Sequence, residues 1–205
     1  MTLAKSILNE AHRAAVFGRR VRVLSEQLSS QLPRNARVLD VGAGDGSIAA
    51  AITELRRDVK IQGIDINLRP TTRIPVRLFD GQRIPFPDGT FDCVMLVDVL
   101  HHTRDPAALI CEAARVTRRH VLIKDHLDSG PFAKQTLRFM DWVGNWGHGV
   151  ALTYNYLAED SWRCIFANAQ LALESWSDHL GLYPFPFSLI FDRQLHMIAK
   201  LAKDD

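Results

Sequence analysis

The stretch Val38-Leu-Asp-Val-Gly-Ala-Gly-Asp-Gly46 runs directly into Ser47-Ile-Ala-Ala-Ala-Ile-Thr-Glu-Leu55. Its first residues form a short apolar run that is typical of a buried strand, and the second segment has helical composition. Three glycines stand between the two, so backbone amides at this turn can approach a ligand without Cβ atoms in the way. We therefore predict a strand, a ligand-binding turn and a helix.

The spacing of these glycines restricts the ligand. A dinucleotide fingerprint has the spacing GxGxxG, whereas here the third glycine falls one position early, at Gly46, and Ser47 follows it. Asp40 and Asp45 would place carboxylates where a pyrophosphate would be repelled. A ligand with an ammonium group suits them better, which leaves a nicotinamide-dependent oxidoreductase as the less favoured alternative. The Gly-Lys-Ser/Thr ending of a nucleotide hydrolase is absent from this turn.

The pattern of strand and helix continues along the chain. Further strands are expected at residues 59–65, 76–80, 91–98 and 119–124, with a helix opening at Asp105-Pro106. The alternation predicts an α/β fold: a Rossmann-like, doubly wound, mostly parallel sheet with helices on both faces and ligands at the carboxyl ends of the strands. Two closing strands, at 173–177 and 195–202, favour an antiparallel end of the sheet.

The flanking segments carry weaker signals. Residues 2–32 have apolar residues near helical spacing and Gly18 between them, so we expect two helices there. Residues 154–171 suggest another helix. The apolar segment 183–191 is expected to be a loop that lines the pocket, mediates a dimer contact or touches lipid.

Length and composition limit the class of protein. A chain of 205 residues fits one domain, and its 25 basic and 23 acidic residues give a net charge of +2 that does not favour nucleic acid as a partner. Three scattered cysteines without a CxxC pair favour a reducing cytoplasm, and no apolar run approaches a membrane span. We divide the single domain into N-terminal helices (1–33), a cofactor-binding core (36–125), an insert that would cover the substrate (127–157), and a closing helix and strands (158–205).

Four motifs in order resemble the class I S-adenosylmethionine-dependent methyltransferases, in particular the small Rossmann-like enzymes of the type 11-like group. These are the glycine turn, Asp65 at the end of the second strand, Asp80-Gly81, and Phe91-Asp-Cys-Val with the following Asp98-Val-Leu-His-His102. The resemblance covers residues 36 to 125. It implies S-adenosylmethionine as the cofactor and a small molecule as the methyl acceptor.

The same resemblance implies roles for single residues. Asp65 would accept hydrogen bonds from both ribose hydroxyls, and Asp40 would pair with the ammonium end of the cofactor. Each has a structural alternative: Asp65 a helix cap or solvated strand end, Asp40 a brace for the glycine turn, and Asp80 an ordinary Asp-Gly turn. The residues expected to bind the cofactor are Asp40, Gly42, Gly44, Gly46, Asp65, Ile66, Asp80, Gly81, Leu96 and Val97.

Candidates for proton transfer lie at the carboxyl ends of the later strands. We expect His126 to be the base, oriented by Asp125 or a backbone group, because a histidine titrates near neutrality and this strand should end over the transferred methyl group. His101-His102 is interpreted as structural. No histidine spacing supports a metal, so no metal site is expected.

The long insert is the expected substrate cover. Trp142, Trp146, His148 and Tyr154 could enclose and orient an acceptor with apolar or ring character. Phe132, Leu137, Met140 and Val143 are interpreted as one amphipathic helix packed on the sheet. We thus predict methyl transfer to a small, partly apolar acceptor, oxygen favoured over nitrogen, by a monomer or homodimer. The alternative from another class is a regulatory protein that binds the cofactor without turnover.

Overall fold

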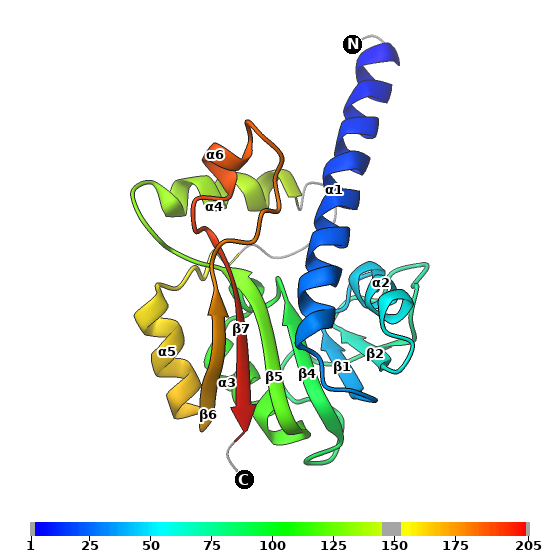
Figure 1. The fold of residues 1–205 in the computed structure, drawn as a ribbon, viewed down its shortest axis with the longest axis vertical. Helices are drawn as coiled ribbons and strands as arrows, with labels where there is room; N and C mark the ends of the chain where they lie inside the picture. The colour runs from blue at the N-terminus through cyan, green and yellow to red at the C-terminus, as the bar shows by residue number, and fades with distance from the viewer. Residues whose placement is uncertain (1–2, 145–152, 204–205) are drawn as a thin grey trace.

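The computed structural model describes the backbone of residues 3–144 and 153–203, and the side chains of residues 17–143 and 153–203. The described strands all belong to one sheet, with helices on both of its faces (Figure 1). The strands are β1 Arg37–Val41, β2 Lys60–Asp65, β3 Val76–Leu78, β4 Phe91–Val97, β5 Thr117–His126, β6 Leu171–Ser177 and β7 His196–Lys203. The helices are α1 Leu3–Gln31, α2 Ser47–Leu55, the 3-10 helix η1 Leu100–His102, α3 Pro106–Val116, α4 Ala133–Gly144, α5 Glu159–Asn168 and α6 Ser188–Phe191.

The order of the strands confirms the predicted fold. The sheet runs β3-β2-β1-β4-β5-β7-β6, in which β1 to β5 pair in parallel and β7 pairs antiparallel with both β5 and β6. The chain winds outward in one direction from β1 to β3 and in the other from β4 onward. The point where the direction changes, between β1 and β4, is where such a sheet opens a crevice at its carboxyl edge.

Two apolar clusters hold the helices against the sheet. On one face Leu24 and Leu28 of α1 and Ile52 of α2 are fully buried. On the other face Leu109 of α3 and Trp162 of α5 are buried against the strands. Burial on both faces explains why β4 reads as an almost continuous apolar run rather than an alternating one.

Two expectations about helices were wrong. Helix α1 passes through Gly18 without a break, because glycine inside a helix costs only about 1 kcal/mol and keeps its backbone hydrogen bonds. Helix α5 begins at Glu159, not at 154: Leu157 forms a parallel bridge with Leu127, and Tyr154 has φ 56°. The segment 183–191, expected to be a loop, contains the short helix α6.

Helices α4 and α6 lie beyond the carboxyl ends of the parallel strands, next to α1 (Figure 1). Ala133 and Leu137 of α4 are buried with Tyr156 and Leu195. Phe132, expected to pack inward, is 72% exposed and has φ 60°, so it precedes the helix and turns out of the packed face. Val143 is exposed as well. Among the residues described, no helix has the length and apolar character needed to span a membrane.

Candidate functional site

The three glycines of the turn between β1 and α2 have different surroundings, although all adopt positive φ. A Cβ atom on Gly42 would lie 2.3 Å from Val99 Cγ2, and one on Gly46 would lie 2.6 Å from Ile74 Cγ1. Gly44 has φ 58° and no atom within 4 Å of the position of a Cβ. Gly42 and Gly46 therefore allow close packing of the turn, whereas Gly44 borders open space.

Asp65 at the end of β2 braces this turn. Its Oδ2 accepts a hydrogen bond from the Gly44 amide at 2.8 Å, and its Oδ1 accepts one from the Asn67 amide at 2.9 Å. The bracing role considered for Asp40 thus falls to Asp65. Each carboxylate oxygen has two lone pairs, so both oxygens of Asp65 can still accept a hydrogen bond from a ligand hydroxyl.

A cavity of about 100 Å³ lies between the turn and helix α1. Asp40 and Asp45 line it together with Arg20. Burial, together with the negative charge of Asp65, raises the pKa of Asp40 to about 7. Val97 lines the cavity too, whereas Leu96, its neighbour in β4, is fully buried in the core. The cavity is lined by Phe17, Arg20, Val21, Asp40, Gly42, Ala43, Asp45, Ser47, Ile48 and Val97.

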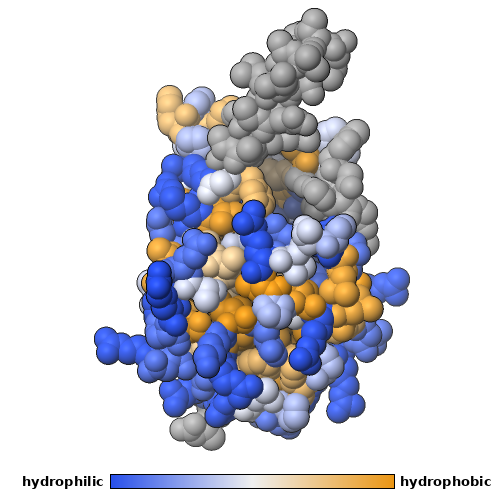
Figure 2. All heavy atoms as spheres, turned by 90° about the vertical axis from the view of Figure 1, so that its right-hand side faces the viewer, coloured by the Kyte–Doolittle hydropathy of each residue, from blue (hydrophilic) through white to orange (hydrophobic). Residues whose placement is uncertain are grey.

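A second group of predicted residues meets beyond Asp65. Ile66 is 65% exposed, and a Cβ atom on Gly81 would lie 3.0 Å from Ile66 Cγ2, so the two residues are in contact. Asp80 accepts hydrogen bonds from the amides of Gln82 and Arg83, which makes it a turn former. These two bonds lower the pKa of Asp80. Figure 2 shows hydrophobic atoms gathered on this side of the molecule, the side that carries α2 and β2.

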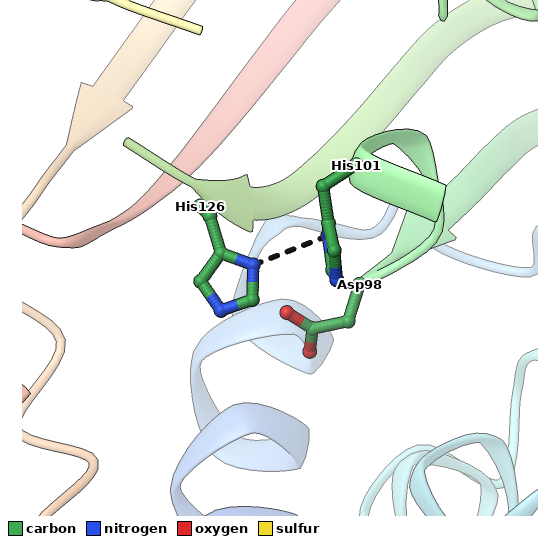
Figure 3. Close-up of side chains that lie close together, drawn as sticks. All are labelled: Asp98, His101 and His126. Carbon is green, nitrogen blue, oxygen red and sulfur yellow. Dashed lines mark hydrogen bonds between the residues drawn. The ribbon is translucent and has the colours of Figure 1, made fainter. Parts of the chain in front are cut away.

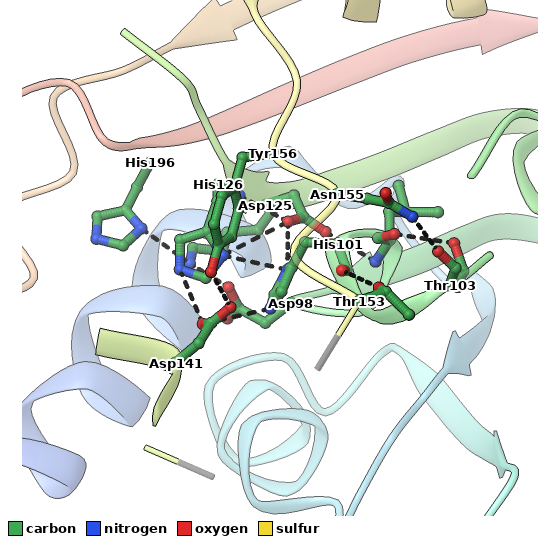
Figure 4. A network of polar contacts seen from close by, with 12 residues as sticks. Asp98, His101, Thr103, Asp125, His126, Asp141, Thr153, Asn155, Tyr156 and His196 are labelled. Atoms are coloured by element: carbon green, nitrogen blue, oxygen red, sulfur yellow. Dashed lines mark hydrogen bonds and ion pairs between the residues drawn. The ribbon is translucent and has the colours of Figure 1, made fainter. Parts of the chain in front are cut away.

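A buried network of charged and polar side chains lies at the carboxyl ends of β4 and β5 (Figure 4). We call it the polar cluster. Its members come from elements far apart in sequence, and the parallel sheet brings them together because β4 and β5 end at the same edge. They are Asp98, His101, Lys124, Asp125, His126, Asp141, Tyr156 and His196.

The shortest contact to a histidine in the polar cluster joins His101 to Asp125. The His101 Nδ1 atom lies 2.6 Å from Asp125 Oδ1, and both side chains are almost completely buried. The amides of Leu100 and His126 also donate to the Asp125 carboxylate, at 2.9 and 2.7 Å, and fix it in place. Burial opposes a charge on His101, but the nearby carboxylates outweigh it and raise the pKa of this histidine.

The expected orientation of His126 by Asp125 is not what the structure shows. Asp125 Oδ1 lies 3.8 Å from His126 Nδ1 and directs its hydrogen bond to His101 instead. Neighbouring residues of a strand point to opposite faces, which explains why Asp125 and His126 do not pair. Burial and the positive charge around His101 hold the pKa of His126 well below its usual value. A catalytic role for His126 remains a prediction.

Helix α1 reaches the polar cluster through an ion pair. Arg20 and Lys124 both bind the carboxylate of Asp98, which follows β4 and has φ 56°. Burial would raise the pKa of Asp98, but the two cations hold it well below its usual value. Burial lowers the pKa of Lys124 despite its carboxylate partner. Arg20 also lines the cavity at the glycine turn, so it connects the cavity with the polar cluster.

Two groups of side chains have donor atoms close enough to surround a metal ion. One is Asp98, His101 and His126, drawn in Figure 3, and the other is His101, His102 and Asp141. In the first group Asp98 already binds two cations, Arg20 and Lys124, which would repel a metal ion. In the second, His101 Nδ1 is bonded to Asp125, and Asp141, which faces His101 Nε2, is bonded to the Tyr156 hydroxyl. We therefore interpret these side chains as a hydrogen-bonded network.

The predicted substrate residues lie on the insert. Trp142 is half exposed on α4, and Tyr154 is half buried with the Arg138 guanidinium 4.8 Å from its ring centroid. Tyr154 lies 6.1 Å from Tyr156, ring centroid to ring centroid, and Tyr156 belongs to the polar cluster. Trp146 and His148 lie outside the described residues.

Comparison with known proteins settles the family. A family model described as a methyltransferase domain matches residues 10–175. The chain belongs to this methyltransferase family. The resemblance of its four motifs to that class is thereby confirmed.

Two curated relatives of this chain show the range of the family. It is 33% identical to 27-O-demethylrifamycin SV methyltransferase of Amycolatopsis mediterranei over 46% of this chain and 40% of the relative. It is 28% identical to the ubiquinone/menaquinone biosynthesis C-methyltransferase UbiE of Cupriavidus metallidurans over 60% of this chain and 58% of the relative. The chain thus spans about two fifths to three fifths of the length of these relatives.

A solved structure shares the fold of this chain. Magnesium protoporphyrin IX methyltransferase from Synechocystis, determined with bound S-adenosylhomocysteine, superposes with a TM-score of 0.57 at 15% identity. The match covers 100% of this chain and 89% of that protein. At this identity the likeness concerns the fold.

The sequence did not point to several members of the site. Arg20 lies on a helix with no motif, Asp141 is one of several polar residues of an amphipathic helix, and His101 was interpreted as structural. One signal could have found the pairing of His101 with Asp125. His101 follows the end of β4 by four residues, and Asp125 is the last residue but one of β5. Because β4 and β5 are adjacent parallel strands, their carboxyl ends lie at the same edge of the sheet.

Proposed function

We propose that this chain binds S-adenosylmethionine and transfers its methyl group to an oxygen atom of a small, partly apolar molecule. The observation that carries the proposal is the buried His101–Asp125 pair, together with the cavity of the glycine turn that Asp40 and Arg20 line. The cavity offers a place for a cofactor with an ammonium group, and the pair offers a proton acceptor. Membership of the methyltransferase family supports the reaction class.

The residues of the turn fit the cofactor. Asp40 would pair with the ammonium group, and the free lone pairs of Asp65 would accept from the ribose hydroxyls. Ile66 and Gly81 would flank the adenine, since Ile66 offers an exposed apolar surface there. Val97 would contact the methionine part across the cavity, and open space at Gly44 allows the close approach.

The chemistry of transfer requires alignment and the removal of one proton. S-adenosylmethionine supplies a methyl group on a sulfonium centre. When the acceptor oxygen takes the methyl group, the sulfur–methyl bond would break to leave S-adenosylhomocysteine, and the hydroxyl proton would pass to His101 Nε2. Asp125 keeps the proton of His101 on Nδ1, so that Nε2 carries the accepting lone pair. This assigns to His101 the role that the sequence suggested for His126.

Three measurements test the proposal. Titration calorimetry should detect S-adenosylhomocysteine and no NAD. Acceptors of the kinds named for the two relatives, a 27-O-demethylated rifamycin and a demethylated menaquinone, are then offered with S-adenosylmethionine, and the mass of the product is recorded. We expect His101→Gln to lower turnover about 10²-fold or more with cofactor affinity unchanged.

The matched variant His126→Gln distinguishes the two histidines. A larger loss in His126→Gln than in His101→Gln would return the base to His126. Binding of S-adenosylhomocysteine without turnover of any acceptor would favour the regulatory alternative. A failure to bind S-adenosylhomocysteine would overturn the proposal as a whole.

A further inference from the structure

Asp141 is the carboxylate that helix α4 contributes to the polar cluster. Its Oδ1 lies 3.6 Å from His101 Nε2 and 3.8 Å from His126 Nε2, and its Oδ2 accepts a hydrogen bond from the Tyr156 hydroxyl at 2.5 Å. The side chain is 5% exposed. The Asp141 carboxylate, held by Tyr156, therefore faces Nε2 of His101, the ring nitrogen that Asp125 does not contact.

His101 therefore has a carboxylate at each end of its ring. Asp125 bonds Nδ1 at 2.6 Å, and Asp141 faces Nε2 at 3.6 Å. Two anions on opposite sides favour a ring that carries a proton on both nitrogens. The raised pKa of His101 agrees with this arrangement.

The charged groups around His101 also favour a ring that is protonated on both nitrogens. The charged and titratable groups around His101 are Arg20 of α1, Asp98 after β4, His102 of η1, Lys124, Asp125 and His126 of β5, Asp141 of α4, Tyr156 before α5, and His196 of β7. Burial, with nearby positive charge, lowers the pKa of His126 and of His196, so these rings are neutral. Three carboxylates then face two cations, and one proton balances the cluster. Burying an unbalanced charge is costly.

The extra proton bears on the reaction. An imidazole with a proton on Nε2 cannot accept another from an acceptor hydroxyl, and Nε2 is the nitrogen that Asp141 faces. We propose that Asp141 is a positioning residue that keeps the Nε2 proton on His101 in the ligand-free protein. An acceptor that replaces Asp141 beside Nε2 makes Asp141 withdraw with that proton, and only then can His101 act as a base. This inference rests on the proposed role of His101.

The protonation of His101 can be measured without an acceptor. Nitrogen-15 spectra of the histidine side chains of the full chain, with the His101 signals assigned by their loss in His101→Asn, give its pKa directly. We expect Asp141→Asn to lower that pKa by about one unit or more, because one of the two adjacent anions is removed. The matched control is Asp128→Asn, which removes a carboxylate that pairs with Lys134 and does not belong to the cluster.

A second variant tests the same inference if Asp141→Asn does not fold. Tyr156→Phe removes the hydrogen bond that stabilises the Asp141 anion, so it should lower the pKa of His101 in the same direction by a smaller amount. An unchanged pKa of His101 in the folded Asp141 variant, or in Tyr156→Phe if the former does not fold, would overturn the inference. So would a neutral His101 at pH 6 in the wild type.

Activity and binding separate this inference from the proposed function. On a true acceptor, kcat/KM should rise with pH in the wild type, and the rise should move to lower pH in Asp141→Asn. Calorimetry with S-adenosylhomocysteine is run on the same samples. Binding without a shift of the His101 pKa overturns only the role of Asp141. A shift without binding supports the role of Asp141 in protonation and overturns the proposed cofactor.

Discussion

At the scale of single residues, Gly44 is the position of the turn where a side chain would extend into open space rather than meet protein. We expect Gly44→Val to fold and to lose binding of S-adenosylhomocysteine, because the branched side chain would occupy the open space. The matched control is Gly130→Val, at another positive-φ glycine with nothing within 4 Å, which shares the backbone strain. Calorimetry and circular dichroism of both variants check this. Unaltered affinity in Gly44→Val would place the ligand elsewhere.

We expect Asp40 to make cofactor binding depend on pH. Its pKa is about 7, and an ammonium group pairs with the ionised form only. The affinity should therefore be constant well above pH 7 and fall as the pH drops through 7, to about one tenth at pH 6 of its value at pH 8. Calorimetric titrations with S-adenosylhomocysteine at both values measure this, with Asp40→Asn expected to bind weakly and without the change. Equal wild-type affinities at pH 6 and 8 would contradict the role of Asp40.

The residues of the glycine turn and of the strand ends could be predicted from local sequence, because each has a fixed position in a strand, turn or helix pattern. Local sequence could not assign the hydrogen bonds of Asp65 or Asp125. Asp65 binds amides 21 residues earlier and 2 residues later, and Asp125 binds a histidine 24 residues earlier. Such partners depend on how η1 turns back over the edge of the sheet, which no local pattern encodes.

At the scale of elements, helix α1 offers a direct test of its continuity through Gly18. No atom lies within 4 Å of a Cβ placed there, and φ is not positive. We expect Gly18→Ala to raise the free energy of unfolding by about 0.4 to 1 kcal/mol, because alanine has the higher helix propensity. Urea unfolding measures the change. The contrasting variant is Gly63→Ala in β2, whose Cβ would lie 2.6 Å from Ala43 Cβ and should destabilise the protein. A loss of stability in Gly18→Ala would mean that the helix bends at this residue.

The helices of the chain were harder to predict than its strands. β1 and β4 are buried on both faces, so their apolar runs identify them without knowledge of their neighbours. Phe132, just before α4, and Val143 within it have helical spacing yet are exposed, while Asp141 of α4 is buried. A carboxylate that turns inward to meet histidines reverses the usual assignment of faces, and the histidines are not neighbours in sequence.

At the scale of the whole molecule, the polar cluster affects how stability varies with pH. His196 is paired across the ladder with His126, its Nδ1 lies 3.4 Å from Lys124 Nζ, and burial with that positive charge lowers its pKa well below 6.5. Below about pH 6.5 the unfolded chain gains a proton at this residue that the folded protein does not. Its contribution to stability is thus present above pH 6.5 and lost on acidification, at up to about 1.4 kcal/mol per pH unit.

We expect the free energy of unfolding of His196→Gln, taken relative to the wild type, to rise as the pH falls from 7.0 to 5.5. Urea unfolding at the two values measures the difference, and taking it relative to the wild type cancels the opposite contribution of Asp40. His179→Gln, on the exposed surface, is the control for removing a histidine. A relative free energy that stays constant would mean that His196 is protonated in the folded protein.

The place of β7 in the sheet has a consequence for synthesis. β7 is the last strand in sequence order, yet it lies between β5 and β6. A nascent chain that has left the ribosome only as far as β6 therefore carries β5 with one open edge, a hazard for pairing with other chains. Until residues 196–203 emerge, β6 has no partner in the sheet and the polar cluster lacks His196. The core between β1 and β5 can form early during translation, but maturation of the site awaits the final strand.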